Sequence, residues 1–115
     1  PITIRPNPFA RIPVVGKHVE ARWLRPTRNA GRELVAIARE AIDDARRARP
    51  HAPVVLNAMF HNVEVVAGSS PYAATDARAH RILERLTALL EFARSEGIAF
   101  ARLGDLPQLL ASAPA

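Results

Sequence analysis

The chain has 115 residues, a formal net charge of +5 and a hydrophobic content of 49%. This length is enough for one domain with one core but not for two, and the hydrophobic content excludes a chain that is disordered by composition. A complete β/α barrel needs about 200–250 residues, so barrel signals in this sequence would describe only part of a barrel.

The positive charge comes almost entirely from arginine, because Lys17 is the only lysine. The arginines are spread along the chain and mixed with acidic residues, whereas a nucleic-acid surface favours a clustered stripe with interleaved aromatic residues. The densest group is Arg46, Arg47 and Arg49, at the end of a predicted helix, where cations are favoured by the helix dipole. We therefore expect a solvated helix end and no nucleic-acid partner.

The sequence contains no cysteine, which excludes disulfides and thiolate metal sites. Its longest apolar run, 54–60, is far shorter than the ~20 residues that cross a bilayer. The first residues lack the basic and apolar regions of a signal peptide. The Arg- and Ala-rich composition is typical of a GC-rich bacterial genome, so we expect a bacterial cytoplasmic protein with no membrane partner. The start at proline indicates that upstream sequence is missing.

Three regions follow from the pattern along the chain. Residues 1–13 contain four prolines, which remove hydrogen-bond donors and predict an extended arm. Residues 14–110 alternate strand and helix signals, and 111–115 are predicted to fray. Strand signals, taken from alternating or continuous apolar residues, cover 18–24, 54–60 and 98–101, with a further strand end at 14–16.

Helix signals lie between these strands. The first helix, capped by Thr27 or Asn29, runs to about residue 49 before Pro50. The second, capped by Thr75 or Asp76, runs to about residue 96, and a third, capped by Asp105, runs through residue 110. Their apolar residues recur at three- and four-residue spacing. In the first helix these are Leu34, Ile37, Ala38, Ala41, Ile42 and Ala45, and in the second they are Ala79, Ile82, Leu83, Leu86, Leu89, Leu90 and Ala93.

The order β-α-β-α-β-α predicts an α/β fold in which parallel strands alternate with helices, as in the C-terminal part of a (β/α) barrel. In such folds the functional site lies at the carboxyl ends of the strands. His61 follows the most buried predicted strand, and imidazole suits general acid–base chemistry because it titrates near neutral pH. The alternative is a histidine that only caps or hydrogen-bonds the loop.

The loop at 61–72 is long for a connection between a strand and a helix, and such loops are often functional. Asn57 shares the strand face of His61, and Tyr72 closes the loop, so both are candidates to line a substrate cleft, as is Glu64. The three-residue spacing of His61 and Glu64 fixes no common face in a loop, so we predict no metal site. The remaining histidines, which we expect to be exposed, are His18, His51 and His80.

The block from Leu56 to His61, with Glu64 and the sequence Gly68-Ser69-Ser70-Pro71-Tyr72 after it, resembles the C-terminal end of polysaccharide deacetylases. The same pattern continues in the amphipathic helix signal that follows, in residues 97–103 and in the closing sequence Leu103-Gly104-Asp105-Leu106. Trp23-Leu24-Arg25-Pro26 is similar to the preceding strand in one bacterial subgroup of the family. The resemblance covers about residues 20–110.

The resemblance implies metal-dependent removal of acetyl groups from a sugar polymer, with His61 as the general acid that protonates the departing amine or alcohol. It also implies a divalent metal such as zinc. The family's base and metal ligands come from blocks nearer the N-terminus, and none of those blocks is present here. No cofactor is therefore expected within this chain, which alone should be inactive.

Two functions stay open at this point. The first is a deacetylase-like hydrolase of which this chain is the C-terminal part, with a carbohydrate substrate. The second is a non-catalytic α/β half-barrel module that associates with the missing N-terminal half or with another copy of the chain, because unpaired strand edges favour pairing.

Overall fold

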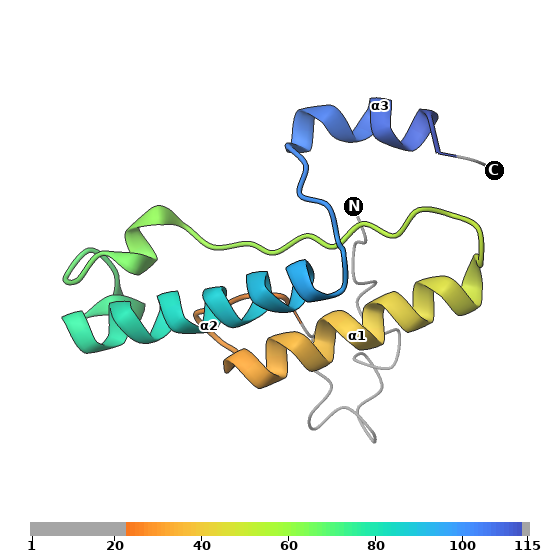
Figure 1. Cartoon of the computed structure of the whole chain (residues 1–115). Helices are drawn as coiled ribbons and strands as arrows, with labels where there is room; N and C mark the ends of the chain where they lie inside the picture. The colour runs from red at the N-terminus through yellow and green to blue at the C-terminus, as the bar shows by residue number, and fades with distance from the viewer. Residues whose placement is uncertain (1–22, 114–115) are drawn as a thin grey trace, which may run out of the picture.

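The computed structural model describes residues 23–113. The predicted arm at 1–13, the strand end at 14–16, most of the strand at 18–24 and residues 114–115 lie outside this range. In chain order the elements are α1 (Gly31–Ala48), η2 (Asn62–Val65), η3 (Pro71–Ala73), α2 (Asp76–Ser95), η4 (Leu103–Asp105) and α3 (Leu106–Ala111), where η denotes a 3-10 helix (Figure 1).

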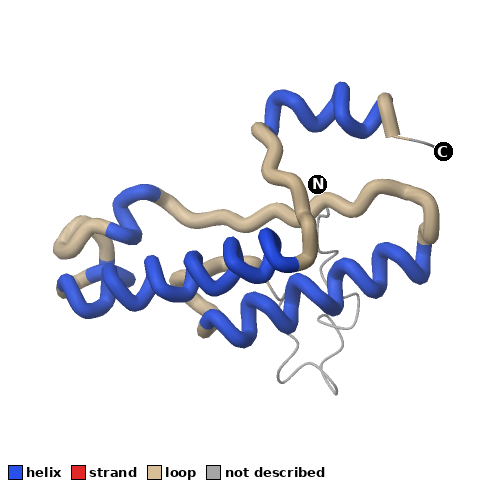
Figure 2. The backbone as a smooth tube through the Cα atoms, viewed as in Figure 1, coloured by secondary structure: helices blue, strands red, loops and turns tan. Residues whose placement is uncertain are grey.

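The prediction of an α/β fold with parallel strands is wrong for the residues that the structure describes. Between residues 23 and 113 there are helices, turns and loops but no strand, so neither a parallel sheet nor part of a β/α barrel is present (Figure 2). The predicted strands at 54–60 and 98–101 are irregular in structure. The described part of the chain is helical.

The two failed strand predictions have a common physical cause. Residues 54–60 follow a long path without helix alongside the α1–α2 pair (Figure 1), and Leu56 and Ile98 both pack against the helical core. Both residues are only partly buried, and Met59, Phe60 and Phe100 are exposed, so these segments are not enclosed on two faces as buried parallel strands would be. A sheet also needs a ladder of backbone hydrogen bonds. Within residues 23–113 the backbone of 54–60 makes one such bond to a distant segment, from Met59 N–H to the carbonyl of Leu24 at 3.1 Å.

The prediction of α1 is confirmed, although its cap differs. Ala30 precedes the helix, and its backbone N–H donates to the carboxylate of Glu33 at 2.8 Å. Asn29 is engaged elsewhere, because its side-chain amide donates to the carbonyl of Trp23 at 2.7 Å. Arg46 and Arg47 lie exposed in the last turn, as the charge pattern indicates.

The prediction of α2 is confirmed together with its two ends. Thr75 Oγ1 accepts a hydrogen bond from the backbone N–H of Arg78 at 3.3 Å, which is the expected N-cap arrangement. Gly97 follows the last turn with a φ of 68°, the left-handed conformation that suits glycine after a helix. α3 begins after Asp105 as predicted, but the Asp105 side chain makes no capping hydrogen bond.

The core lies between α1 and α2, which run side by side (Figure 1). Two further contacts join these helices. Arg39 pairs with Glu96 at 3.0 Å and stacks over the ring of Phe92, with 4.8 Å between guanidinium carbon and ring centre. The buried residues of this core, half of them from the predicted stripe of α1, are Leu24, Leu34, Ile37, Ala38, Leu89 and Phe92.

A second, smaller core holds the region of η2 and η3 against the start of α2. Ala73, Ala79 and Ile82 are buried there, and Val65 packs against them. Ser70 Oγ accepts a hydrogen bond from the backbone N–H of Ala73 at 3.2 Å and so caps η3. This small core gives the loop at 61–72 a fixed position at the end of the helix pair.

Candidate functional site

His61 and Glu64 are brought together by the first turn of that loop. The backbone N–H of Glu64 donates to the carbonyl of His61 at 2.9 Å, which forms the 3-10 turn. Glu64 Oε2 in return accepts a hydrogen bond from the backbone N–H of His61 at 3.2 Å. A carboxylate three residues after a helix cap commonly binds the free N–H of the cap in this way. The expectation that this spacing gives no common face is therefore wrong.

Glu64 is the one buried charged residue in the part of the chain that the structure describes. Its side chain is 3% exposed, and Arg25 Nη2 contacts its Oε1 at 2.6 Å. The Arg25 side chain is 15% exposed, so this ion pair is largely removed from water. Because a buried carboxylate without a partner is strongly unfavourable, the arginine is needed to hold Glu64 inside the protein.

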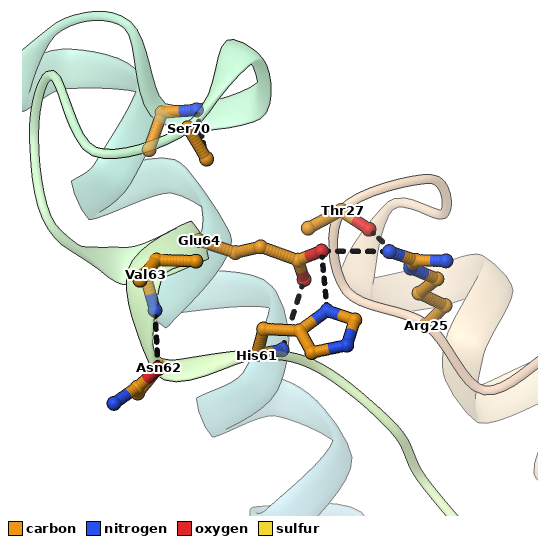
Figure 3. Close-up of polar contacts among 8 residues, drawn as sticks. Arg25, Thr27, His61, Asn62, Val63, Glu64 and Ser70 are labelled. Carbon is orange, nitrogen blue, oxygen red and sulfur yellow. Dashed lines mark hydrogen bonds and ion pairs between the residues drawn. The ribbon is translucent and has the colours of Figure 1, made fainter.

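The same oxygen of Glu64 binds the ring of His61. His61 Nδ1 lies 3.1 Å from Oε1, as the dashed lines in Figure 3 show. An ionised carboxylate only accepts hydrogen bonds, so this contact requires the proton to be on Nδ1. Nε2 has no hydrogen-bond partner among residues 23–113. The His61 side chain is 62% exposed to solvent.

Arg25 also connects the three segments that surround the pair of His61 and Glu64. Its Nε donates to Thr27 Oγ1 at 2.9 Å within its own loop. Its guanidinium lies over the ring of Tyr72 in η3, with 5.5 Å between the guanidinium carbon and the ring centre. Contacts of this length fall in the range of cation–π attraction. The loop at 23–29, η2 and η3 therefore meet at one arginine.

The surroundings favour the charged form of Glu64. Burial would raise the pKa of its carboxyl group, but hydrogen bonds from His61 and Arg25 and the charge of Arg25 have the larger combined effect and lower that pKa below the usual value. Glu64 is therefore an ionised acceptor near neutral pH. Such a carboxylate orients an imidazole ring and stabilises a positive charge on it.

The candidate residues named from the sequence are only partly brought together. His61, Glu64 and, through Arg25, Tyr72 form one cluster. Asn57 instead lines an apolar groove together with residues of 98–101 and α3, and His61 is not part of that groove. His51 and His80 are exposed as predicted, and His18 lies outside the described residues.

Arg25 is the residue that sequence reasoning missed. It lies 39 positions before Glu64, and no local spacing connects the two residues. The cap pattern of an acidic residue three positions after His61 could have indicated the contact of His61 with Glu64. The arginine could not have been found in this way, because its contact depends on how the chain returns past α1.

The cluster does not fit the divalent metal that the resemblance implies. Within residues 23–113, no three His, Cys, Asp or Glu side chains gather closely enough to hold an ion. Glu64 is also already paired with a guanidinium, which would repel a cation at the same oxygen. We therefore assign no step to a metal in this cluster.

Comparisons with protein-family models, curated proteins and solved structures find no match to this chain. The resemblance to polysaccharide deacetylases thus rests on the sequence pattern alone. In addition, neither long helix of the described residues contains an apolar stretch that would span a membrane.

Proposed function

We propose that this chain supplies the general acid of a polysaccharide-deacetylase-like hydrolase, with His61 as the catalytic residue. The observation that carries the proposal is the contact of His61 Nδ1 with buried Glu64, while Nε2 of this largely exposed side chain has no hydrogen-bond partner among residues 23–113. A histidine whose one nitrogen is fixed by a carboxylate and whose other nitrogen is free is the usual arrangement for proton transfer.

In this role the doubly protonated ring gives its Nε2 proton to the departing nitrogen or oxygen of the sugar while the bond from that atom to the acetyl carbon breaks. Nδ1 keeps its proton and its hydrogen bond to Glu64 throughout. The carboxylate keeps the ring in this orientation, and the ring regains its proton from solvent afterwards. The groups that activate the attacking water belong to the blocks of the family that residues 23–113 do not contain.

The proposal is tested with the protein expressed from the complete reading frame that encodes these residues, by measuring acetate release from acetylated sugar oligomers. We expect His61→Ala to lower kcat by roughly 10²–10⁴-fold, the usual contribution of a general acid. His80→Ala is the matched control, because His80 also lies close to a glutamate, Glu84, but both side chains are exposed at the surface of α2. This control should keep the wild-type rate.

Either of two results would contradict the proposal. One is a His61→Ala variant with a near-normal rate, and the other is a complete protein that releases no acetate from any acetylated sugar. If acetate is released but both histidine variants lose activity equally, the effect is not specific to the site and the assignment of His61 also fails.

A second candidate function, association with another polypeptide, is favoured by the groove that Asn57 lines. The groove is mostly apolar and is lined by residues of α1, α2 and α3 as well as 54–58 and 98–101, and Phe100 and Leu103 are strongly exposed. Exposed apolar surface of this kind often marks a contact with another chain. The architecture foreseen for such a module, a half-barrel, is wrong, but association itself stays a proposal. The His61→Ala variant separates the two functions, because association through the groove does not involve His61.

A further inference from the structure

Two polar side chains share one carboxylate oxygen of Glu64, which a simple histidine–carboxylate pair does not show. Both Arg25 Nη2, at 2.6 Å, and His61 Nδ1, at 3.1 Å, bind Oε1 of Glu64. Oε2 is held by the backbone N–H of His61. The shorter contact belongs to the arginine, so the carboxylate oxygen that binds the imidazole is also paired with a positive charge (Figure 3).

The contact of Arg25 with Glu64 changes the electrostatic environment of the His61 ring. A buried carboxylate facing a histidine alone favours the doubly protonated imidazole, because that form supplies the missing positive charge. With Arg25 in place, the charge of Glu64 is already balanced. The carboxylate then orients His61 through Nδ1 without forcing a second proton onto it.

We propose that Arg25 is a positioning residue for His61, which balances the charge of Glu64 so that the carboxylate holds the imidazole in one orientation through Nδ1 without drawing a second proton onto the ring. The catalytic meaning of this arrangement rests on the proposed function, whereas the positioning itself does not. The groups that face Glu64 in the described structure are Arg25 and His61, while Thr27 and Tyr72 contact the arginine.

The contacts of Arg25 on its other sides keep it in place for this role. Its Nε is bound by Thr27 and its flat face lies over Tyr72, so the guanidinium presents Nη2 to Glu64. Arginine suits this arrangement because its planar group can donate at an edge and stack on its face at once. The chain offers a comparable arginine away from the site, Arg39, which pairs with Glu96 and stacks on Phe92.

The test is a nitrogen NMR measurement on the imidazole rings of the ¹⁵N-labelled 115-residue chain at pH 7.5, with the His61 signals assigned by their loss in His61→Ala. The quantity measured is the fraction of His61 that carries protons on both nitrogens. We expect the ratio of doubly to singly protonated His61 to be about tenfold larger in Arg25→Met than in the wild type, since an unbalanced charge at this distance shifts the protonation equilibrium by about one pK unit.

Three further variants make the result specific. Arg39→Met should keep the wild-type fraction, because it removes an equivalent pair of contacts elsewhere. Arg25→Met combined with Glu64→Gln should remove the increase, because no buried negative charge is left. Arg25→Gln, which keeps a donor but loses the charge, should show the increase, and it decides the question if Arg25→Met does not fold.

A wild-type fraction in both neutral Arg25 variants would overturn the proposal, as would an equal increase in Arg39→Met. A merely structural arginine could lower stability in these variants, but it would not change the protonation of His61 in the folded protein. The measurement needs no substrate. A failed acetate-release assay would therefore contradict the proposed function and leave the positioning role of Arg25 standing.

Discussion

At the scale of single residues, Glu64 links the stability of the loop to pH. Its pKa is lowered in the folded chain, so the folded state holds this proton less tightly than the unfolded state does. The stabilisation is therefore complete above the unfolded carboxyl pKa, about 4.3. It is lost as the pH falls through the lower folded value.

This relation predicts that the melting temperature of the wild type falls more steeply than that of Glu64→Gln between about pH 4.5 and pH 3. At neutral pH the Gln variant should be less stable by about 3 kcal/mol, because Arg25 loses its buried partner. Thermal unfolding followed by circular dichroism measures both effects. Glu84→Gln, at an exposed pair, is the control and should follow the wild type. Parallel curves for the wild type and Glu64→Gln would rule out the linkage.

At the scale of elements, the position of Arg25 depends on the close approach of α1 and α2. Gly31 is the first residue of α1 and lies close to α2, so that a Cβ atom placed on it would lie 2.9 Å from the Cβ of Ala88. Real Cβ atoms do not approach this closely, and neither backbone can move without shifting its helix. The loop that carries Arg25 leads directly into α1, and Arg85 of α2 donates to the carbonyl of Pro26 at 3.1 Å. The helix pair therefore sets where Arg25 lies.

Gly31→Ala should accordingly destabilise the chain by about 1–3 kcal/mol, the usual cost of overpacking, although alanine favours helix formation. Urea unfolding gives this value. Gly104→Ala is the matched control, because a Cβ there has no neighbour within 4 Å, and it should have little effect. A Gly31→Ala variant as stable as the wild type would show that the two helices are not in tight contact.

At the scale of the whole molecule, the sequence predicts what is local and fails for what is not. The helices α1 and α2 are found because a stripe of apolar residues at helical spacing is visible within each segment, and Thr75 and Gly97 mark the ends of α2. The apolar run at 54–60 predicts burial on two faces, yet residues 54–56 are half-buried and residues 57–60 are exposed. It holds no information on whether a neighbouring strand exists, and in the described structure helices take that place.

In the candidate site too, the sequence predicts the local contacts and misses the distant one. His61 and Glu64 are close in sequence, and their cap pattern can be recognised. Arg25 contacts Glu64 only because the chain, after α1, passes back beside the loop at 23–29. Asn57 is not part of the cluster, because it lines the groove instead. The resemblance to deacetylases draws attention to His61 but provides neither the partner arginine nor the buried state of Glu64.

The most direct test of the central claim, that His61 transfers a proton through Nε2, is chemical rescue of the His61→Ala protein expressed from the complete reading frame. Small imidazoles of different basicity are added and the rate of acetate release is measured for each. Because the His61 side chain is largely exposed, its removal leaves a position that solutes can reach. We predict that added imidazole raises the rate of the variant but not of the wild type, and that the rescued rate changes with the basicity of the imidazole. A variant whose rate stays unchanged with every imidazole would contradict the account.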